Sequence, residues 1–458
     1  MKIIDKQLFL TSAFDKKLTF LLLPILNKMD NNNTTQISTK HFSSMEKDHK
    51  YLEKLLSDLI RCYPCYLGDG SGIKEAQAIV RQELISLGFI VKEISVTENE
   101  IKKHPLYVDV SDWGPLFSDY SPEKNISQTG TLIIDKHAPM LALNGHVDVE
   151  PVFDPTIWAD PTLWKSGQVV GNKIYGRGSA DMLGGVAGML FALKHVLSNS
   201  KSPCVNISFH SVADEEVGGN GTLKCLLTGQ KPDWALIAEP TELSINQQSL
   251  GFHHFVIKTL GRSVHMSQAG NNQNAIDVSM EVHKRLKGLI KKLNKIIKLA
   301  PEFRNININP LIVGRINGGF DPAVPAEECT LEGVLFSSSN QTKKDIEKLL
   351  DQALTGNTPL NATSYISNMS FDGSNSSDQA VSNTLLQSGK EVNIQLPVNG
   401  FPSPCDMRLY TSFGVPTTIF GPGSLKQAHS ANEFVRREEL FNFSKIMVNF
   451  LQNFSGNN

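Results

Sequence analysis

The chain lacks the features that several common protein classes require. Six cysteines in 458 residues are too few and too scattered for a disulfide framework, so we interpret them as reduced thiols. No stretch approaches the roughly 20 apolar residues that span a bilayer. Neither charge sign is in excess, because 44 Lys and Arg face 46 Asp and Glu, for a net charge of -2. We therefore expect no membrane and no nucleic acid among the partners, since a polyanion requires a basic surface.

The N-terminal segment also lacks the pattern of a folded domain. Its apolar part, Leu18–Leu26, follows Lys16 and Lys17 as the core of a secretory signal would. Pro24 interrupts this run, however, and no small-residue cleavage site follows it. We predict that residues 1–44 form a poorly structured extension and that the protein is cytoplasmic.

The composition that is present is that of a globular protein, with 40% hydrophobic and 20% charged residues. Helical patterns cover Lys47–Ile60, Lys74–Leu87 and Gly184–Leu197, and Gly88 ends the second of these. Short apolar runs that predict strands cover Phe89–Val96, Leu132–Ile134, Met140–Leu143, Val205–Val212, Trp234–Ala238 and Pro416–Phe420. This alternation predicts an α/β fold with a mixed, mostly parallel sheet and helices on both faces.

The pattern changes near residue 251. It predicts a strand, a long amphipathic helix, two strands, a helix and a strand, at His254–Leu260, Ala275–Leu299, Ile308–Ile316, Cys329–Phe336, Lys343–Leu354 and Ala362–Ser370. This β-α-β-β-α-β order is typical of a ferredoxin-like α+β module. The first pattern resumes after Asp372–Asp378, which is rich in Ser and Asn and reads as a linker. We predict a discontinuous catalytic domain, 45–250 and 373–458, with an inserted domain at 251–372.

Four apolar runs of the first domain lead into histidines or acidic residues. In chain order these are His146 and Asp148, then Asp214–Glu216, then Glu239, and finally His429. Asp181 lies in a further stretch, flanked by glycines. In open α/β sheets ligands bind beyond the carboxyl ends of the strands. Each residue alone indicates little, but imidazoles and carboxylates gathered at strand ends predict a zinc-type metal site.

Two other motifs carry less weight. The glycine-rich stretch around Asp181 matches neither G-x-x-x-x-G-K-[ST] nor G-x-G-x-x-G, so it does not predict a nucleotide site. Cys62 and Cys65 have the spacing of a redox or zinc motif. One pair cannot complete a tetrahedral zinc site, so we interpret both as ordinary thiols. Cys405 has no neighbouring base in the sequence, which argues against a nucleophile.

Five motifs occur in the order GHVD, GRGSADMLGG, DEEVGG, AEPT, and GPG with the later AHSANE. They resemble those of the aminoacylase/carboxypeptidase-type di-zinc metallohydrolases, which include acetylornithine deacetylase and succinyl-diaminopimelate desuccinylase. The resemblance runs from about Tyr51 to Val448. It implies two divalent metal ions, zinc first and cobalt or manganese as alternatives. It also implies that the inserted domain is a lid or dimerisation domain, and hence a homodimer.

The resemblance implies five metal ligands. Asp181 would bridge the two ions, because cations about 3.5–4 Å apart need a shared anion to offset their repulsion. His146 and Glu239 would complete the coordination of one ion. Glu216 and His429 would complete that of the other.

Three catalytic residues are implied as well. Asp148 would accept a hydrogen bond from the second ring nitrogen of His146 and so fix its tautomer. Glu215 would be the general base, passing a proton from water to the leaving amine. His265 would stabilise the oxyanion in the active site of a partner subunit. The alternative interpretation of His265 is an exposed histidine on a lid strand.

The predicted function is that of a metal-dependent amidohydrolase similar to acetylornithine deacetylase. Metal-bound hydroxide would remove an acetyl, formyl or succinyl group from a small-molecule N-acyl amine or amino acid. One alternative is a dipeptidase or carboxypeptidase of the same family, since the same centre can cleave peptide amides. The other is a catalytically silent binding protein with the same fold.

The chain departs from the family pattern at three positions. Leu183 stands where most relatives have Lys, so the charge of that side chain near the metal ligands is absent. The lid Asn usual before Val324 is replaced and Phe336 stands where Arg is usual, which changes how a substrate carboxylate would bind. Arg262 and Arg408 could substitute for the missing cation. A solvated arginine is the simpler interpretation of each.

Overall fold

The computed structural model describes residues 48–111, 113–114, 117, 120–198, 202–268, 274–356 and 358–456. The extension predicted for residues 1–44, with Leu18–Leu26, lies outside these residues. By its contacts the chain divides into two units, Met1–Tyr51 and Leu52–Asn458. Both major sheets and all the predicted site residues belong to the second unit.

A nine-stranded sheet has the order β1-β2-β6-β3-β7-β15-β8-β13, with β14 paired to β8. Its strands are β1 (Ile90–Glu93), β2 (Gln128–Leu132), β3 (Met140–His146), β6 (Asn206–Val212), β7 (Trp234–Ile237), β8 (Ile245–Ser249), β13 (Ser374–Asn375), β14 (Val398–Phe401) and β15 (Thr417–Ile419). The neighbours β6, β3, β7 and β15 run parallel. The strands β2 and β8 that flank them are antiparallel to them. The predicted mixed sheet with a parallel centre is confirmed.

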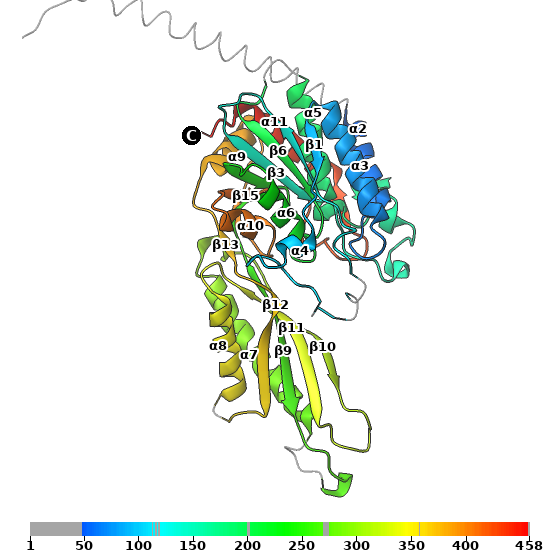
Figure 1. Ribbon diagram of the computed structural model, residues 1–458, viewed down its shortest axis with the longest axis vertical. Coiled ribbons are helices and arrows are strands. Elements are labelled where there is room, and N and C mark those ends of the chain that lie inside the picture. The colour runs from blue at the N-terminus through cyan, green and yellow to red at the C-terminus, as the bar shows by residue number, and fades with distance from the viewer. Residues whose placement is uncertain are drawn as a thin grey trace, which may run out of the picture. The chain divides into compact units, whose positions relative to one another are not determined.

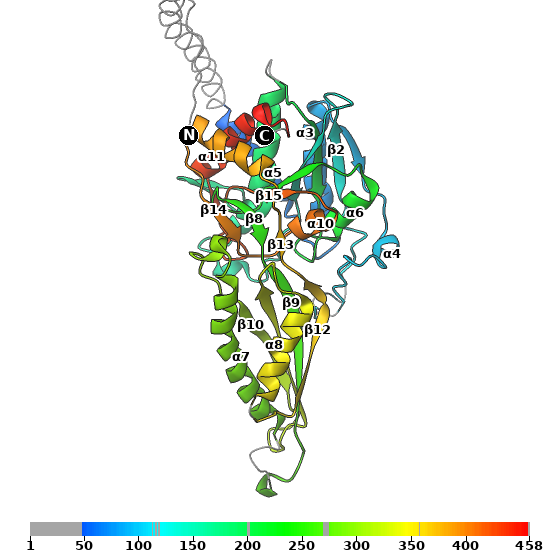
Figure 2. The ribbon, with the colours of Figure 1, turned by 90° about the vertical axis from the view of Figure 1, so that its left-hand side faces the viewer.

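Most helices of this part of the chain lie around this sheet, and the shortest of them lies apart from it (Figures 1 and 2). They are α2 (His49–Cys62), α3 (Ser71–Ser86), α4 (Glu98–Ile101), α5 (Gly184–Leu197), α6 (Asn220–Thr228), α9 (Ala380–Glu391), α10 (Met407–Ser412) and α11 (Arg437–Asn453). Every residue of β3 and β6 is buried, as expected for strands covered on both faces. Ser179–Leu197 is long and apolar enough to cross a membrane, but 89% of it is buried inside the fold, as in a core helix.

Most predicted helices and strands are found near their predicted bounds, and α5 has the bounds predicted for it. Gly88 follows α3 with a φ of 88°, and its N–H donates to the carbonyl of Ile85, so the predicted helix end is confirmed. The strand predicted at Leu132–Ile134 is wrong, because β2 ends at Leu132. Backbone pairing with β6 and the buried side chain of Gln128 hold β2 in place, and neither leaves an apolar signal in the sequence.

A second, four-stranded antiparallel sheet has the order β10-β11-β9-β12. Its elements are β9 (Gly251–Leu260), α7 (Ala275–Ile297), β10 (Leu311–Gly318), β11 (Glu328–Ser337), α8 (Lys343–Thr355) and β12 (Ala362–Phe371). Figure 2 shows α7 and α8 together on one face of this sheet, and both contact its strands. A core that includes Phe255, Leu286, Leu335 and Ile346 lies between helices and strands. The predicted β-α-β-β-α-β order is present, in the strand order of a ferredoxin-like module.

The connections between the two sheets are short. β9 follows β8 after Leu250, and β12 leads through Asp372 and Gly373 into β13, which pairs with β8. The segment Asp372–Asp378 is therefore partly a strand of the central sheet. A Cβ atom on Gly251 would lie 2.6 Å from the backbone nitrogen of Gly373, so the two connections touch and glycine is required there.

Candidate metal centre

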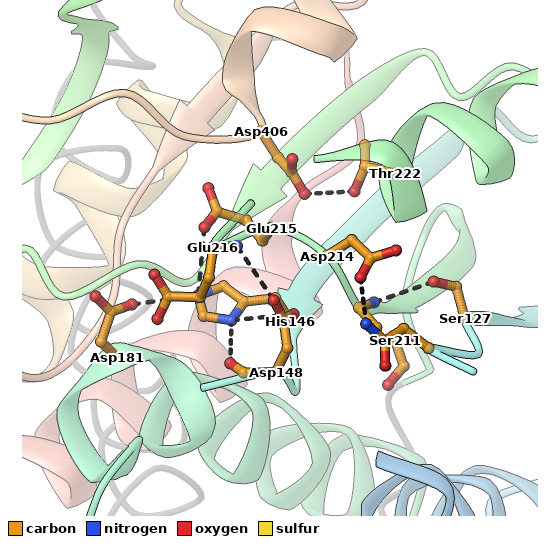
Figure 3. Close-up of polar contacts among 12 residues, drawn as sticks. Ser127, His146, Asp148, Asp181, Ser211, Asp214, Glu215, Glu216, Thr222 and Asp406 are labelled. Carbon is orange, nitrogen blue, oxygen red and sulfur yellow. Dashed lines mark hydrogen bonds and ion pairs between the residues drawn. The ribbon is translucent and has the colours of Figure 1, made fainter. Parts of the chain in front are cut away.

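The carboxyl ends of the parallel strands deliver most of the site. His146 is the last residue of β3, Glu215 and Glu216 follow β6, and Glu239 follows β7. His429 lies in the loop between β15 and β16 (Phe434–Arg436). Because β6, β3, β7 and β15 are neighbours, their ends meet at one edge of the sheet. Figure 3 shows His146, Glu215 and Glu216 close together there.

Asp181 lies between the two histidines. Its Oδ1 is 3.2 Å from Nε2 of His146, and its Oδ2 is 3.4 Å from Nε2 of His429. Glu239 is on the His146 side, with Oε1 3.9 Å from Nε2 of that histidine. Glu216 is on the other side, with Oε2 3.1 Å from Nε2 of His429. The structure thus brings together all five residues that the sequence proposed as ligands, in the two predicted pairs around Asp181.

The adjacent acids Glu215 and Glu216 turn toward different histidines. Oε2 of Glu215 is 3.9 Å from Nε2 of His146, whereas Glu216 contacts His429. The backbone N–H of Glu216 donates to Oδ2 of Asp148 at 3.1 Å, which fixes the turn between the two acids. The two neighbours can therefore hold different roles.

Asp148 contacts His146 in a way that differs from the prediction. Nδ1 of His146 lies 2.9 Å from the main-chain oxygen of Asp148, while the carboxylate Oδ1 is 3.6 Å away. The backbone oxygen rather than the carboxylate is therefore the nearer acceptor. The consequence for the ring is the predicted one, since a proton held on Nδ1 leaves the lone pair of Nε2 pointing at Asp181.

A buried ion pair supports the loop that carries Asp181. Glu433 is fully buried, and its Oε2 accepts a hydrogen bond from Nη1 of Arg177 at 2.7 Å. Its Oε1 accepts the backbone N–H groups of Ala180 at 3.0 Å and of Asp181 at 3.3 Å. Gly178, with a φ of 82°, turns the chain between these contacts. The sequence placed Glu433 only within the motif AHSANE and gave it no role.

The first turn of α5 lies against the end of β7. A Cβ atom on Gly185 would lie 2.2 Å from the main-chain oxygen of Ala238. Only glycine allows this approach, which brings the loop of Asp181 and the side chain of Glu239 to the same point.

Burial strongly affects the ionisation of these acids. Burial raises the pKa of Glu216, His429 lowers it in part, and the result is a pKa of about 7. Burial and the neighbouring Glu239 raise the pKa of Glu215 well above its usual range. Burial would also raise the pKa of Asp181, but its contacts with both histidines outweigh burial and lower it. Buried carboxylates outnumber the imidazoles here, so protons or cations must neutralise them.

The residues fit divalent metal ions. Three groups of side chains have ligand atoms within 4.8 Å of one another: His146, Asp181 and Glu216; His146, Glu215 and Glu239; and Glu150, Glu216 and His429. Oε1 of Glu239 is buried and has no hydrogen-bond partner within the described part of the chain. A buried carboxylate oxygen without a donor is costly unless a cation binds it. Imidazole and carboxylate are also the ligands that zinc and related ions accept.

Sequence reasoning missed Glu150. It lies beside Glu216 and His429, and its Oε2 accepts a hydrogen bond from the hydroxyl of Tyr66 at 3.1 Å. The signal was available, because residues 146, 148 and 150 alternate along one extended segment and so share a face. Asp406 is a second acid near the centre, and burial raises its pKa to about 6. Its carboxylate accepts the hydroxyl of Thr222 (Figure 3).

The two candidate arginines differ in their surroundings. Arg262 is exposed, as its interpretation as solvated requires. That interpretation is wrong for Arg408, which is only 8% exposed and lines the same cavity as Glu215. The error has a physical cause, because the main-chain oxygen of Gly218 accepts a hydrogen bond from its guanidinium and the ring of Phe371 covers it.

His265 is the one predicted site residue that the structure does not bring to the centre. It is exposed, and its Nδ1 lies 2.9 Å from the hydroxyl of Ser267. It follows Leu260, the end of β9 that is farther from the central sheet, and a ten-residue strand spans roughly 33 Å. Within one chain His265 is therefore remote from Asp181, and its role in the site stays a prediction that requires a partner subunit.

The profile of peptidase family M20/M25/M40 matches residues 142–453. Among curated proteins, the N-formyl-4-amino-5-aminomethyl-2-methylpyrimidine deformylase of Bacillus subtilis is 29% identical over 68% of this chain and 78% of its own length. The acetylornithine deacetylase of Erwinia tasmaniensis is 30% identical over 64% of this chain and 75% of its own. The solved structure of the dipeptidase Dug1p from Saccharomyces cerevisiae covers 92% of this chain and 98% of its own, with a TM-score of 0.70 and 14% identity.

Proposed function

The chain belongs to peptidase family M20/M25/M40, and we propose that it is a metal-dependent hydrolase that removes an N-acyl group from a small amine or amino acid. The two curated relatives support formyl and acetyl as the acyl groups. Cleavage of dipeptides is the second candidate. It is supported by similarity of fold alone.

One observation carries this proposal. Asp181 offers one carboxylate oxygen to His146 and the other to His429, and each histidine has a further acid beside it. A shared carboxylate between two half-sites is the arrangement that two closely spaced cations need. We propose His146 and Glu239 as ligands of one ion, Glu216 and His429 as ligands of the other, and Asp181 as the bridge.

Zinc is our first choice for both ions, because histidine and carboxylate ligands suit it, with cobalt or manganese as alternatives. Bound there, such ions would supply a Lewis acid for the amide carbonyl and would lower the pKa of water.

The protein's own proton carrier in this proposal is Glu215. Its carboxylate lies beside His146 without being needed in either ligand pair. Its raised pKa suits a group that must take a proton from water at its Oε atom and then release it to the nitrogen of the leaving amine. Asp148 and Glu433 are positioning residues, the first holding Nδ1 of His146 and the second holding the backbone N–H of Asp181.

We further propose a cytoplasmic homodimer that forms through the second sheet. Ile312 and Ile316 of the edge strand β10 are 50% and 54% exposed, and Met280 of α7 is also exposed. An edge strand with exposed apolar side chains is a surface that a second chain can cover. Such a dimer is also what a role for His265 in the site requires.

The test is an assay of the purified full-length chain after loading with zinc, cobalt or manganese. Elemental analysis gives the number of bound ions, and formyl, acetyl and succinyl amines are compared with dipeptides as substrates. We expect hydrolysis of formyl or acetyl amines that a chelator abolishes and added metal restores. Stoichiometric metal without hydrolysis of any compound would identify a silent binding protein instead, and failure to bind metal would contradict the centre itself.

A further inference from the structure

The cavity that contains the metal centre has a chemically mixed lining. It has a volume of about 440 Å³, and acidic residues together with His429 form part of its lining. Five aromatic residues also line it: Phe401, and four whose rings pack around one another, namely Trp113, Phe252, Phe336 and Phe371. We call these four residues the aromatic wall.

Phe252 is the middle of the aromatic wall. Its ring is stacked on that of Phe371, with centroids 5.4 Å apart and an interplanar angle of 17°. The rings of Trp113 and Phe336 lie 5.5 Å and 6.3 Å from it. All four side chains are only partly buried. The rings therefore support one another and still present surface to the cavity.

The position of the aromatic wall is fixed by the short connections between the sheets. Phe252 is the second residue of β9 and Phe371 is the last of β12, and they pair directly across the sheet. The close approach of Gly251 and Gly373 beside them holds this end of the second sheet against β8 and β13. Glu215 and His429 line the same cavity, so the wall and the metal centre can contact one substrate at once.

The charges around the cavity disfavour a substrate carboxylate. Among the described residues that line it, Arg408 is the only lysine or arginine. Its guanidinium donates to the main-chain oxygen of Gly218 and lies 4.4 Å from the ring centroid of Phe371, and Asp406 balances its charge. The other ionisable groups that line the cavity, His429 and Cys405 aside, are acids. A substrate carboxylate would therefore find no free lysine or arginine to pair with in this lining, whereas an aromatic ring can pack against the faces and edges of the four aromatic rings.

We propose that the leaving amine of the substrate carries an aromatic or heteroaromatic ring and no carboxylate, and that this ring lies against Phe252 and Phe371. This inference rests on the proposed function, because it assigns the amine half of an N-acyl amine whose carbonyl lies at the metal centre. The aromatic wall is then a specificity site, and the lack of a free cation in the cavity lining disfavours amino-acid substrates.

Three matched compounds test the inference on the metal-loaded wild-type protein. N-formylphenethylamine differs from N-formylphenylalanine only by the carboxylate, and from N-formyl-2-cyclohexylethylamine only by aromaticity. We expect kcat/KM for the phenethyl compound to exceed that for each of the others by about tenfold. The free amines should rank in the same order when their binding is measured by calorimetry. Equal or higher kcat/KM for the phenylalanine or cyclohexyl compound would overturn the proposal.

A variant locates the ring. Phe252→Leu should lower kcat/KM about tenfold more for N-formylphenethylamine than for N-formylmethylamine, since the smaller compound has no ring to lose contact. Tyr365→Leu is the matched control, because Tyr365 is an exposed aromatic residue of β12. Phe371→Leu, at the other ring of the stacked pair, serves in its place if Phe252→Leu does not fold or bind metal. A folded, metal-loaded variant that keeps the wild-type preference would overturn the position of the ring.

The experiments distinguish a failure of the aromatic proposal from a failure of the proposed function. Preferred hydrolysis of acyl amino acids would leave the proposed function standing and remove the aromatic proposal. If the metal-loaded protein hydrolyses none of the formamides or the corresponding acetamides, both are wrong.

Discussion

Asp181 and His429 meet through Oδ2 and Nε2, 3.4 Å apart, while the other oxygen of the Asp181 carboxylate faces His146. The loop of His429 and the end of β3 are far apart in the sequence, and Asp181 is the side chain that they share. Because the carboxylate is divided between two imidazoles, its loss should disturb both halves of the centre at once.

Asp181→Asn should therefore reduce the content of both metal ions and not of one alone. An amide keeps the shape of the side chain but removes the negative charge that would offset the repulsion between two cations. Elemental analysis of the purified variant after metal loading gives the result. Asp160→Asn is the control, because Asp160 is an exposed acid that contacts only its own loop. Unchanged metal content in Asp181→Asn would contradict the bridge.

The neighbouring acids Glu215 and Glu216 should separate chemistry from metal binding. Glu215→Gln should lower kcat by about 10²–10⁴-fold, the usual contribution of a general base, with metal content intact. Glu216→Gln is the matched variant one residue away, and it should lose the ion on the His429 side. Steady-state kinetics and metal analysis are measured on both variants. If Glu215→Gln keeps most of its kcat, another group is the base.

The sequence predicts those site residues that directly follow the strands of the central sheet. Residues that follow parallel neighbouring strands must converge at one edge, so His146, Glu216 and Glu239 could be grouped before any coordinates were known. Glu150 was within reach of the same reasoning, since it lies on the face of His146 and Asp148.

Other parts depend on packing between distant segments, which no local pattern records. The guanidinium of Arg408 is buried by Gly218, which lies in the loop after β6, and by Phe371, which ends β12 of the second sheet. The aromatic wall forms only where the second sheet joins the first, and Phe252 and Phe371 have no motif of their own. The domain boundaries at 250/251 and 372/373 and the role of His265 stay predictions.

The ion pair of Arg177 with Glu433 should contribute strongly to stability. Both side chains are buried, and Glu433 also accepts two backbone N–H groups. Glu433→Gln leaves the guanidinium buried without its counter-charge, which should lower the free energy of unfolding by about 3–5 kcal/mol. Lys426→Gln, which breaks an exposed pair with Glu242, should change it little. Denaturant unfolding of the metal-free proteins measures the free energy of unfolding of both variants. Equal losses in the two variants would contradict a larger contribution of the buried pair.

His210 should make the fold sensitive to acid. Its ring is buried between the hydroxyls of Tyr410 and Ser208, and burial lowers its pKa to about 4. In the unfolded chain a histidine takes up its proton near pH 6.5, so the unfolded state binds more protons between these two values. Stability is full above about pH 6.5 and falls as the pH drops toward 4, by about 3 kcal/mol for this group.

This pH dependence is measured by denaturant unfolding of the metal-free protein between pH 7 and 4.5. In His210→Gln the slope of stability against pH should be smaller, because the group that titrates is gone. His137→Gln, at an exposed histidine, should keep the wild-type slope. The same slope in His210→Gln as in the wild type would assign the acid sensitivity to other groups.

Glu150 should affect one metal ion and not the other. One of its carboxylate oxygens lies within 4.8 Å of candidate ligand atoms of Glu216 and His429, whereas His146 and Glu239 form their group without it. Glu150→Gln should weaken the ion on the His429 side by about 10–100-fold, the usual effect of removing an acid that supports the ligands of a metal ion. Tyr66→Phe is the control, because it removes the hydrogen bond to Oε2 and keeps the charge. Stepwise metal titration followed by calorimetry resolves the two affinities. Equal weakening of both ions, or none, would exclude Glu150 from this half of the centre.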